Sequence, residues 1–157
     1  MAQPALGAQE LFSTIAPQDQ LGFYTDDAFR PKALVEFLGL SNVDVSHIVG
    51  ISKNSVRYDA SIPSEMLERL EEIANICNLV AHHFGGNVQK TALWFKTKNP
   101  LLGDIAPRDM IRFARYDKLR RFVIGALTDQ SLNDKAARRA SRARTSGARA
   151  HESAAPE

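Results

Sequence analysis

Residues 63–84 read PSEMLERLEEIANICNLVAHHF, the longest amphipathic stretch of the chain. Its apolar side chains recur at steps of three and four residues, the spacing of one face of an α-helix. They are Met66, Leu67, Leu70, Ile73, Ala74, Cys77, Val80, Ala81 and Phe84. Glutamates fill the first turns, where the helix dipole favours negative charge, and Gly85-Gly86 follows the last turn. The pattern predicts one long helix with a single buried face.

Shorter helices are predicted on both sides of this stretch. Proline favours the first position of a helix, asparagine is a good cap, and glycine commonly follows the last residue. On these signals the sequence predicts helices over residues 31–38, 87–97, 107 onward and 117–127. No segment alternates between apolar and polar residues as a strand does, so we expect an all-α fold.

The composition fits one globular domain with tails. The chain has 157 residues, of which 44% are hydrophobic and 24% charged, close to the averages for soluble domains. Its single cysteine, Cys77, cannot form an intramolecular disulfide, which favours a reducing compartment. Residues 1–7 do not look like a signal peptide, and no apolar run reaches the ~20 residues of a membrane helix. We therefore expect a cytoplasmic protein with no membrane partner.

Charge is distributed unevenly along the chain. Residues 1–134 carry 14 basic against 16 acidic side chains, whereas residues 135–157 carry six against two. From Thr128 onward the sequence is rich in Ala, Arg and Ser, with no large apolar residue beyond Leu132. Such a segment cannot bury enough surface to offset its conformational entropy, so residues 129–157 are predicted to be disordered. Two roles remain open for this basic tail: a DNA arm, which we favour because the body is nearly neutral, or an arm along a protein partner.

Residues 42–58 have the pattern of a helix-turn-helix. Residues 42–49 form the predicted first helix, Gly50 supplies the turn, and Ser52 caps a short second helix over residues 53–58. The outward positions of the second helix hold residue types that contact phosphates and base edges. With the cap, they give a candidate DNA-binding set of Ser52, Lys53, Asn54, Ser55 and Arg57. A bare helical hairpin is the alternative, and Asp59 at an inward position indicates a short second helix.

Side chains with catalytic potential are few and scattered. His82 and His83 are neighbours on the predicted long helix, where adjacent side chains point about 100° apart, and no third ligand is near. Cys77 belongs to the apolar stripe, and Gly85-Gly86 lacks the spacing of a phosphate-binding loop. We expect neither an enzyme nor a bound metal or cofactor.

The second half of the chain holds the most specific motif. Trp94 is followed by Asn99-Pro100-Leu101-Leu102-Gly103 and then by Ala106-Pro107-Arg108-Asp109-Met110-Ile111. This string resembles the toxin-binding domain of the Xre/MbcA/ParS-like antitoxins. In that family a Trp, an Asn-Pro-x-Leu-Gly turn and a Pro-x-x-x-Ile helix start follow an Xre-type helix-turn-helix. The resemblance covers roughly residues 31–127, and it departs at Asp104, where the family turn commonly has a second glycine.

The resemblance implies an antitoxin of a bacterial type II toxin–antitoxin pair. Such a protein covers the NAD-binding cleft of a RES-domain toxin that consumes NAD⁺. It also represses its own operon by binding operator DNA, as a homodimer or in a larger toxin–antitoxin complex. The expected division is an arm (1–27), a helix-turn-helix domain with the long helix (28–84), a toxin-binding domain (85–128) and the basic tail (129–157). The candidate toxin-binding residues are Asn99, Leu101, Leu102, Gly103, Arg108, Arg112, Arg115, Lys118, Arg120 and Arg121.

Two other functions remain open. A stand-alone helix-turn-helix transcription regulator would use its C-terminal half only for dimerisation, and an adaptor would bind a different protein and no DNA. The motif from Trp94 to Gly103 favours the antitoxin over the regulator, which has no need of such a turn. Within it we expect Trp94 to pack with Leu101 and Leu102, and Gly103 to permit the reversal into the next helix.

Overall fold

The computed structural model describes residues 19–151, with side chains up to residue 146, and is mostly helical. The described residues fall into two units, the first up to Arg120 and the second from Arg121 onward. The parts of the predicted arm and tail that fall in residues 1–18 and 152–157 lie outside the described residues. None of the helices in the described part combines the length and the apolar character that a membrane crossing requires.

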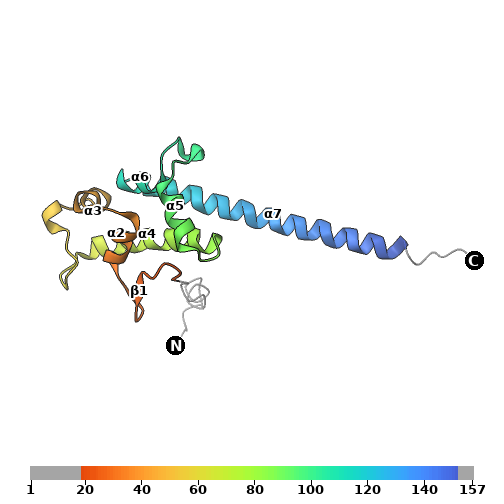
Figure 1. The fold of residues 1–157 in the computed structure, drawn as a ribbon, viewed down its shortest axis with the longest axis horizontal. Helices are drawn as coiled ribbons and strands as arrows, with labels where there is room; N and C mark the ends of the chain where they lie inside the picture. Colours follow the sequence, from red (N-terminus) through yellow and green to blue (C-terminus); the bar gives the residue numbers. More distant parts are fainter. Residues whose placement is uncertain (1–18, 152–157) are drawn as a thin grey trace, which may run out of the picture. The chain divides into compact units, whose positions relative to one another are not determined.

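The helices of residues 19–151 are joined by short turns, except that longer loops connect α3 to α4 and α5 to α6 (Figure 1). They are α2 (Pro31–Leu38), α3 (Asn42–Val49), α4 (Ser64–His83), α5 (Val88–Lys96), α6 (Pro107–Arg112) and α7 (Tyr116–His151). Two 3₁₀ turns are η1 (Lys53–Ser55) and η2 (Pro100–Leu102), and a short hairpin consists of β1 (Tyr24–Thr25) and β2 (Ala28–Phe29). The bounds predicted for α2, α3, α4 and α5 are confirmed to within one residue, and within these residues β-structure is limited to the two-residue strands and a bridge between Asn99 and Ile105.

Helix α4 forms the centre of the first unit. Met66, Leu70, Ile73 and Cys77 on its inner face are fully buried, and the helix packs against α2, α3 and α5. Burying one such side chain stabilises the fold by about 1.5–3 kcal/mol, so this stripe contributes strongly to the stability of the unit. Burial also raises the pKa of the Cys77 thiol above its ordinary value, as expected for a core residue.

The segment before α2 belongs to the folded body, although the sequence analysis placed it in an arm. Phe23 is 1% exposed; its ring meets Phe37 edge to face at 5.6 Å between centroids, and Phe37 in turn meets Phe95 at 6.2 Å. The Asp19 carboxylate accepts the backbone N–H groups of Phe23 at 2.8 Å and Tyr24 at 2.9 Å. Single anchoring side chains hold this segment, so it shows none of the periodicity by which helices are predicted.

The hairpin in this segment turns through two aspartates. Asp26 and Asp27 have φ of 50° and 62°, and positive φ at both central residues is the mark of a type I′ turn, which matches the twist of paired strands. Beside the hairpin, the Tyr24 hydroxyl donates to Glu71 of α4 at 2.9 Å. Burial, followed by this contact with Glu71, raises the pKa of Tyr24 to about 12.

Helix α7 contradicts the prediction of a disordered tail over its described part. The sequence predicts the last helix to end near Leu127, whereas α7 continues to His151. The composition argument concerned burial, and residues 128–146 are indeed all exposed. However, alanine, arginine and lysine are among the strongest helix formers. Local propensity therefore gives a helix where no buried face exists.

Candidate protein-binding surface

The first part of the predicted helix-turn-helix is present. Ser41 and Asp44 form a capping box at the start of α3: the Asp44 N–H donates to the Ser41 hydroxyl, and the Ser41 N–H donates to the Asp44 carboxylate. Gly50 ends the helix with φ of 80°, a left-handed conformation that glycine adopts without strain. The Ser46 hydroxyl donates to the Ile51 carbonyl at 2.6 Å and fixes the chain leaving the turn.

The predicted second helix over residues 53–58 is not formed. The chain makes one 3₁₀ turn, η1, and is extended again at Val56. Ser52 does not cap a helix, because its hydroxyl pairs with the Ser55 hydroxyl at 2.8 Å. The prediction was wrong because Ser, Asn and Val are weak helix formers, and so short a helix needs a buried face. Here Val56 is the one aliphatic residue after the cap, and it is only half-buried.

The candidate DNA-binding residues therefore lie on a turn and not along a helix face. Lys53 and Asn54 are exposed, whereas Arg57 donates from Nη2 to Asp59 Oδ2 at 2.8 Å. A hydrogen bond from the Ser61 N–H, followed by Arg57, lowers the pKa of Asp59 below its ordinary value. Arg57 would have to leave this pair to reach a nucleic acid.

The loop between α5 and α6 is organised by Asn99. Its N–H donates to the Ile105 carbonyl at 3.2 Å, its carbonyl accepts from Leu102 and Asp104, each at 3.0 Å, and its side-chain Oδ1 accepts from Leu101 at 3.0 Å. Gly103 follows with φ of 78°, and Asp104 with φ of 60°. Asp104 thus takes a left-handed conformation in the place where the resembling family has glycine, and aspartate is among the residues that tolerate it best.

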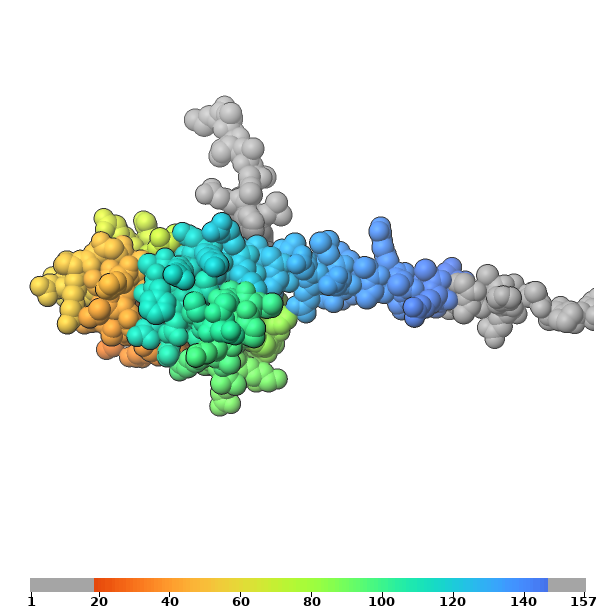
Figure 2. All heavy atoms as spheres, turned by 90° about the horizontal axis from the view of Figure 1, so that it is seen from above, coloured from red at the N-terminus to blue at the C-terminus, as the bar shows by residue number. Residues whose placement is uncertain are grey.

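This loop separates its two leucines. Leu102 is 5% exposed and anchors the loop in the core, whereas Leu101 is 80% exposed. The predicted packing of Leu101 against Trp94 is therefore wrong, and Leu102 cannot contact a partner from its buried position. In Figure 2 the green-to-teal segment that contains η2 and α6 is uncovered at the surface of the body. The loop therefore exposes Leu101 to solvent on a backbone that hydrogen bonds hold in place.

Two further apolar side chains on the neighbouring elements are exposed, and the sequence analysis did not select them. Leu93 on α5 is 66% exposed, and Phe113 at the end of α6 is 65% exposed, while Trp94 is half-buried. A signal for Leu93 was present, because residues 92–95 are all apolar. Four successive helical positions point in four directions 100° apart, so they cannot all face the core.

Arg112 and Arg108, two of the six predicted basic contacts, lie against other parts of the fold. Arg112 lies 3.3 Å from Asp44 of α3 through Nε and donates to Asp109 at 3.2 Å through Nη1. Arg108 lies 3.9 Å from Asp109 Oδ1 through Nε, which is buried without a hydrogen bond to a described residue. Its Nη1 comes close to Gly39 at the end of α2, 3.7 Å from where a Cβ would stand. Partial burial raises the pKa of Asp44, but hydrogen bonds with Ser41 and the Arg112 guanidinium outweigh it, and the net shift is downward. Arg112 thus ties α6 to the start of α3.

The other four basic candidates remain on the surface. Arg115, Lys118, Arg120 and Arg121 are all exposed around the start of α7. Tyr116 fixes this start, because its hydroxyl donates to the Glu72 carbonyl of α4 at 2.9 Å and Arg69 lies 5.5 Å from its ring centroid. Burial, followed by the charge of Glu72, raises the pKa of Tyr116 to about 12.

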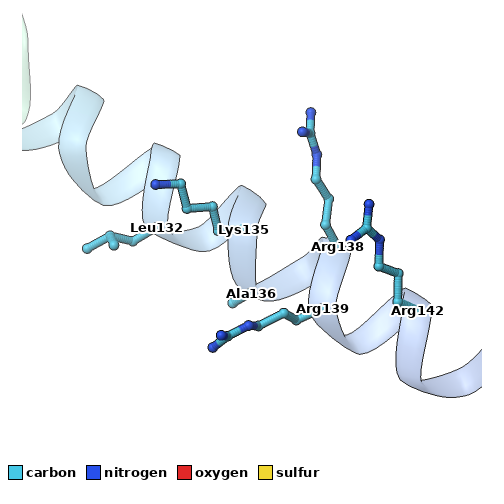
Figure 3. Close-up of a pocket in the computed structure, with 6 residues that line it drawn as sticks. All are labelled: Leu132, Lys135, Ala136, Arg138, Arg139 and Arg142. Carbon is cyan, nitrogen blue, oxygen red and sulfur yellow. The ribbon is translucent and has the colours of Figure 1, made fainter.

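The described residues offer little for a metal ion or a small molecule. Among the described residues, no group of three or more His, Cys, Asp and Glu side chains could hold a metal ion. Figure 3 shows a hollow lined by Leu132, Lys135, Ala136, Arg138, Arg139 and Arg142, all of them on α7. Because one helix supplies every lining residue, this hollow is an open surface and not an enclosed cavity.

Comparison of the chain with models of known protein families, with curated proteins and with solved structures gives no match. The class of this protein therefore has to be argued from its own motif and from the geometry of its surface.

Proposed function

We propose that this protein is an antitoxin of a type II toxin–antitoxin pair, which binds a RES-domain, NAD-consuming toxin and covers its active-site cleft. The observation that carries the proposal is the loop of residues 99–105, which buries Leu102 and leaves Leu101 80% exposed. Its sequence is also the part of the chain that resembles the toxin-binding domain of the Xre/MbcA/ParS-like antitoxins.

The loop of residues 99–105 has the properties of a preorganised protein-binding element. Interfaces derive most of their energy from a few large side chains that fill pockets on the partner. A side chain on a rigid loop loses little conformational freedom on binding, because its backbone is already ordered. The four hydrogen bonds of Asn99 provide this order for Leu101. Leu93 and Phe113 would add apolar area.

Charge supplements this apolar surface. Arg115, Lys118, Arg120 and Arg121 are exposed and would meet acidic groups around the toxin's cleft. Charges at the rim of an interface act mainly on the association rate and its salt dependence. Arg108 and Arg112, by contrast, support the fold from inside, through the contacts with α2 and α3 described above.

The test is co-purification with the RES-domain protein encoded beside this chain. Leu101→Ser should lower the affinity about 10- to 100-fold, because the burial of one leucine on binding is worth about 1.5–3 kcal/mol. Leu79→Ser is the matched control, since Leu79 is an exposed leucine on α4, 42% exposed, and it should change little. Equal affinity of L101S and wild type would remove the loop from the interface. Failure of the wild type to bind the toxin would refute the antitoxin proposal.

A stand-alone helix-turn-helix regulator is the second candidate function. The capped helix α3, the Gly50 turn and the exposed Lys53 and Asn54 favour it. In either function we expect α3 and the η1 turn to bind operator DNA, as a homodimer or, for the antitoxin, also in a toxin–antitoxin complex. Arg57→Ala should weaken operator binding by about 1–3 kcal/mol if Arg57 reads a base. Unchanged binding in a gel-shift assay would exclude this turn from the DNA interface.

A further inference from the structure

A stripe of positive charge runs along the second unit. Lys135, Arg138, Arg139 and Arg142 are exposed on α7, and no acidic residue lies between Asp134 and Glu152. At 100° per residue these four side chains fall within an arc of about 100°, whereas Arg144 lies on the opposite side. Figure 3 shows all four, with Arg138 and Arg142 extending next to each other. We call Lys135, Arg138, Arg139 and Arg142 the basic stripe.

The basic stripe has no partner within the part of the chain that the structure describes. None of its four side chains forms an ion pair or a hydrogen bond with a described residue. Its members are spaced three and four residues apart, where like charges on a helix repel and destabilise it by about 0.2–0.5 kcal/mol per pair. A polyanion would relieve this repulsion, so the stripe has a physical reason to bind one.

The rest of the helix surface identifies the polyanion. A helix that lies on a membrane needs bulky apolar residues opposite its charges, and residues 133–146 contain none. The positions around the stripe hold small residues, among them Ala136, Ala137, Ala140, Ser141 and Ala143. Small side chains keep the helix slim, and the DNA major groove is about 12 Å wide, enough for an α-helix. Duplex DNA therefore fits this helix better than a lipid surface does.

We propose that the basic stripe of α7 binds the phosphates of double-stranded DNA as a preformed helix, without reading the base sequence. The proposal goes beyond the proposed antitoxin function, because it assigns DNA contact to residues far in sequence from both the loop at 99–105 and the turn at η1. The side chains facing the duplex are cationic and flexible, and phosphate contacts carry no sequence information. Specificity, if present, comes from other residues of the chain.

The experiment measures binding of the full chain to a short duplex of scrambled sequence at several salt concentrations. Each neutralised phosphate contributes a slope of about 0.9 in log affinity against log salt, so four contacts predict about 3.6. Arg138→Gln with Arg142→Gln should lower the slope by about 1.8. Glutamine keeps the helix propensity near that of arginine, and circular dichroism verifies that the helix is retained.

Two controls separate a site from net charge. Lys32→Gln with Lys90→Gln removes two exposed charges from the first unit and should leave the slope unchanged. Arg144→Gln removes one charge from the opposite side of α7 and should weaken binding less than Arg139→Gln does. If R138Q/R142Q had the same salt slope as K32Q/K90Q, and R139Q bound DNA as tightly as R144Q, the stripe would not be a binding site.

Two further measurements test whether the stripe binds a lipid surface instead of DNA, and whether DNA binding is independent of toxin binding. Vesicles containing anionic phospholipid should bind the chain more weakly than the duplex does. Binding to vesicles without binding to the duplex would overturn the proposal. Co-purification of R138Q/R142Q with the toxin should equal that of wild type, so loss of DNA binding and failure of the antitoxin function are separately visible.

Discussion

The loop at residues 99–105 and the exposed part of α7 are two candidate binding surfaces whose conformations are fixed in opposite ways. The loop has no regular structure beyond one 3₁₀ turn, and its shape depends on Asn99 and on the anchoring of Leu102 in the core. Residues 128–146 of α7 are a regular helix, all of it exposed, whose shape depends only on the propensities of its own residues. Long-range packing fixes the first surface and local backbone preference fixes the second. The two should respond to different mutations.

The largest expected difference is between two leucine truncations. Leu102→Ala should lower the free energy of unfolding of the first unit by about 2–4 kcal/mol, because it leaves a cavity under the loop. Leu132→Ala, at a leucine that is 59% exposed on α7, should change it by less than about 0.5 kcal/mol. Urea unfolding followed by Trp94, the single tryptophan of the chain, measures both. Equal effects would show that the loop is not anchored as described.

A proline in α7 should disrupt the exposed helix and leave the stability of the first unit unchanged. Ala140→Pro removes a backbone donor from the middle of the exposed helix, which costs about 3 kcal/mol of local helix stability. Circular dichroism should show a loss of helix, and binding to duplex DNA should weaken. The Trp94 unfolding curve should stay in place. A shift of that curve would mean that the exposed helix supports the first unit.

The ion pair between α3 and α6 adds a pH dependence to the first unit. The folded pKa of Asp44 is lowered, so its contribution is fully present above the ordinary aspartate value of 3.8 and is lost as pH falls through the folded pKa. Asp44→Asn should lower the free energy of unfolding at neutral pH by about 1–2 kcal/mol. It should also flatten the acid limb of the stability profile. An unchanged acid limb would assign the pH dependence to other carboxylates.

The smallest effect compares one substitution in two places. Ala114 has φ of 57°, a left-handed conformation that strains a residue with a Cβ by about 1–2 kcal/mol. Ala114→Gly should therefore stabilise the first unit by about 0.5 kcal/mol, after the entropy of the freer unfolded chain is subtracted. Ala136→Gly should instead lower the helix content of α7, because glycine is a weak helix former. Destabilisation by A114G would contradict the observed backbone.

The same contrast explains what the sequence could predict. The helices α2, α4 and α5 were predictable because their caps and apolar spacing agree with their packing: Pro31, Gly39 and Asn87 mark their ends. The segment around Phe23 could not be predicted, because its order comes from residues of α2 and α4 that are distant in the sequence. The prediction of a second helix at residues 53–58 was wrong because it rested on the helix-turn-helix pattern, whereas the residues there have weak helix propensity.

The candidate surface was predictable in position but not in detail. The motif from Trp94 to Gly103 indicated the loop correctly as a distinct element. Which leucine faces solvent depends on the hydrogen bonds of Asn99, and composition carries no information about them. Likewise, the basic residues after Thr128 were recognised, but their ordering into one stripe required the helix.

The aromatic row from Phe23 through Phe37 to Phe95 constrains the order in which the chain folds. Its members lie on three segments, and the last of them leaves the ribosome well after the first. Domains generally fold as units during synthesis, and Phe37, which contacts both other rings, can complete this row only after α5 has been made. Until then the Phe37 ring lacks its contact with Phe95, so the aromatic row closes only after the long helix α4 and most of the first unit have been synthesised.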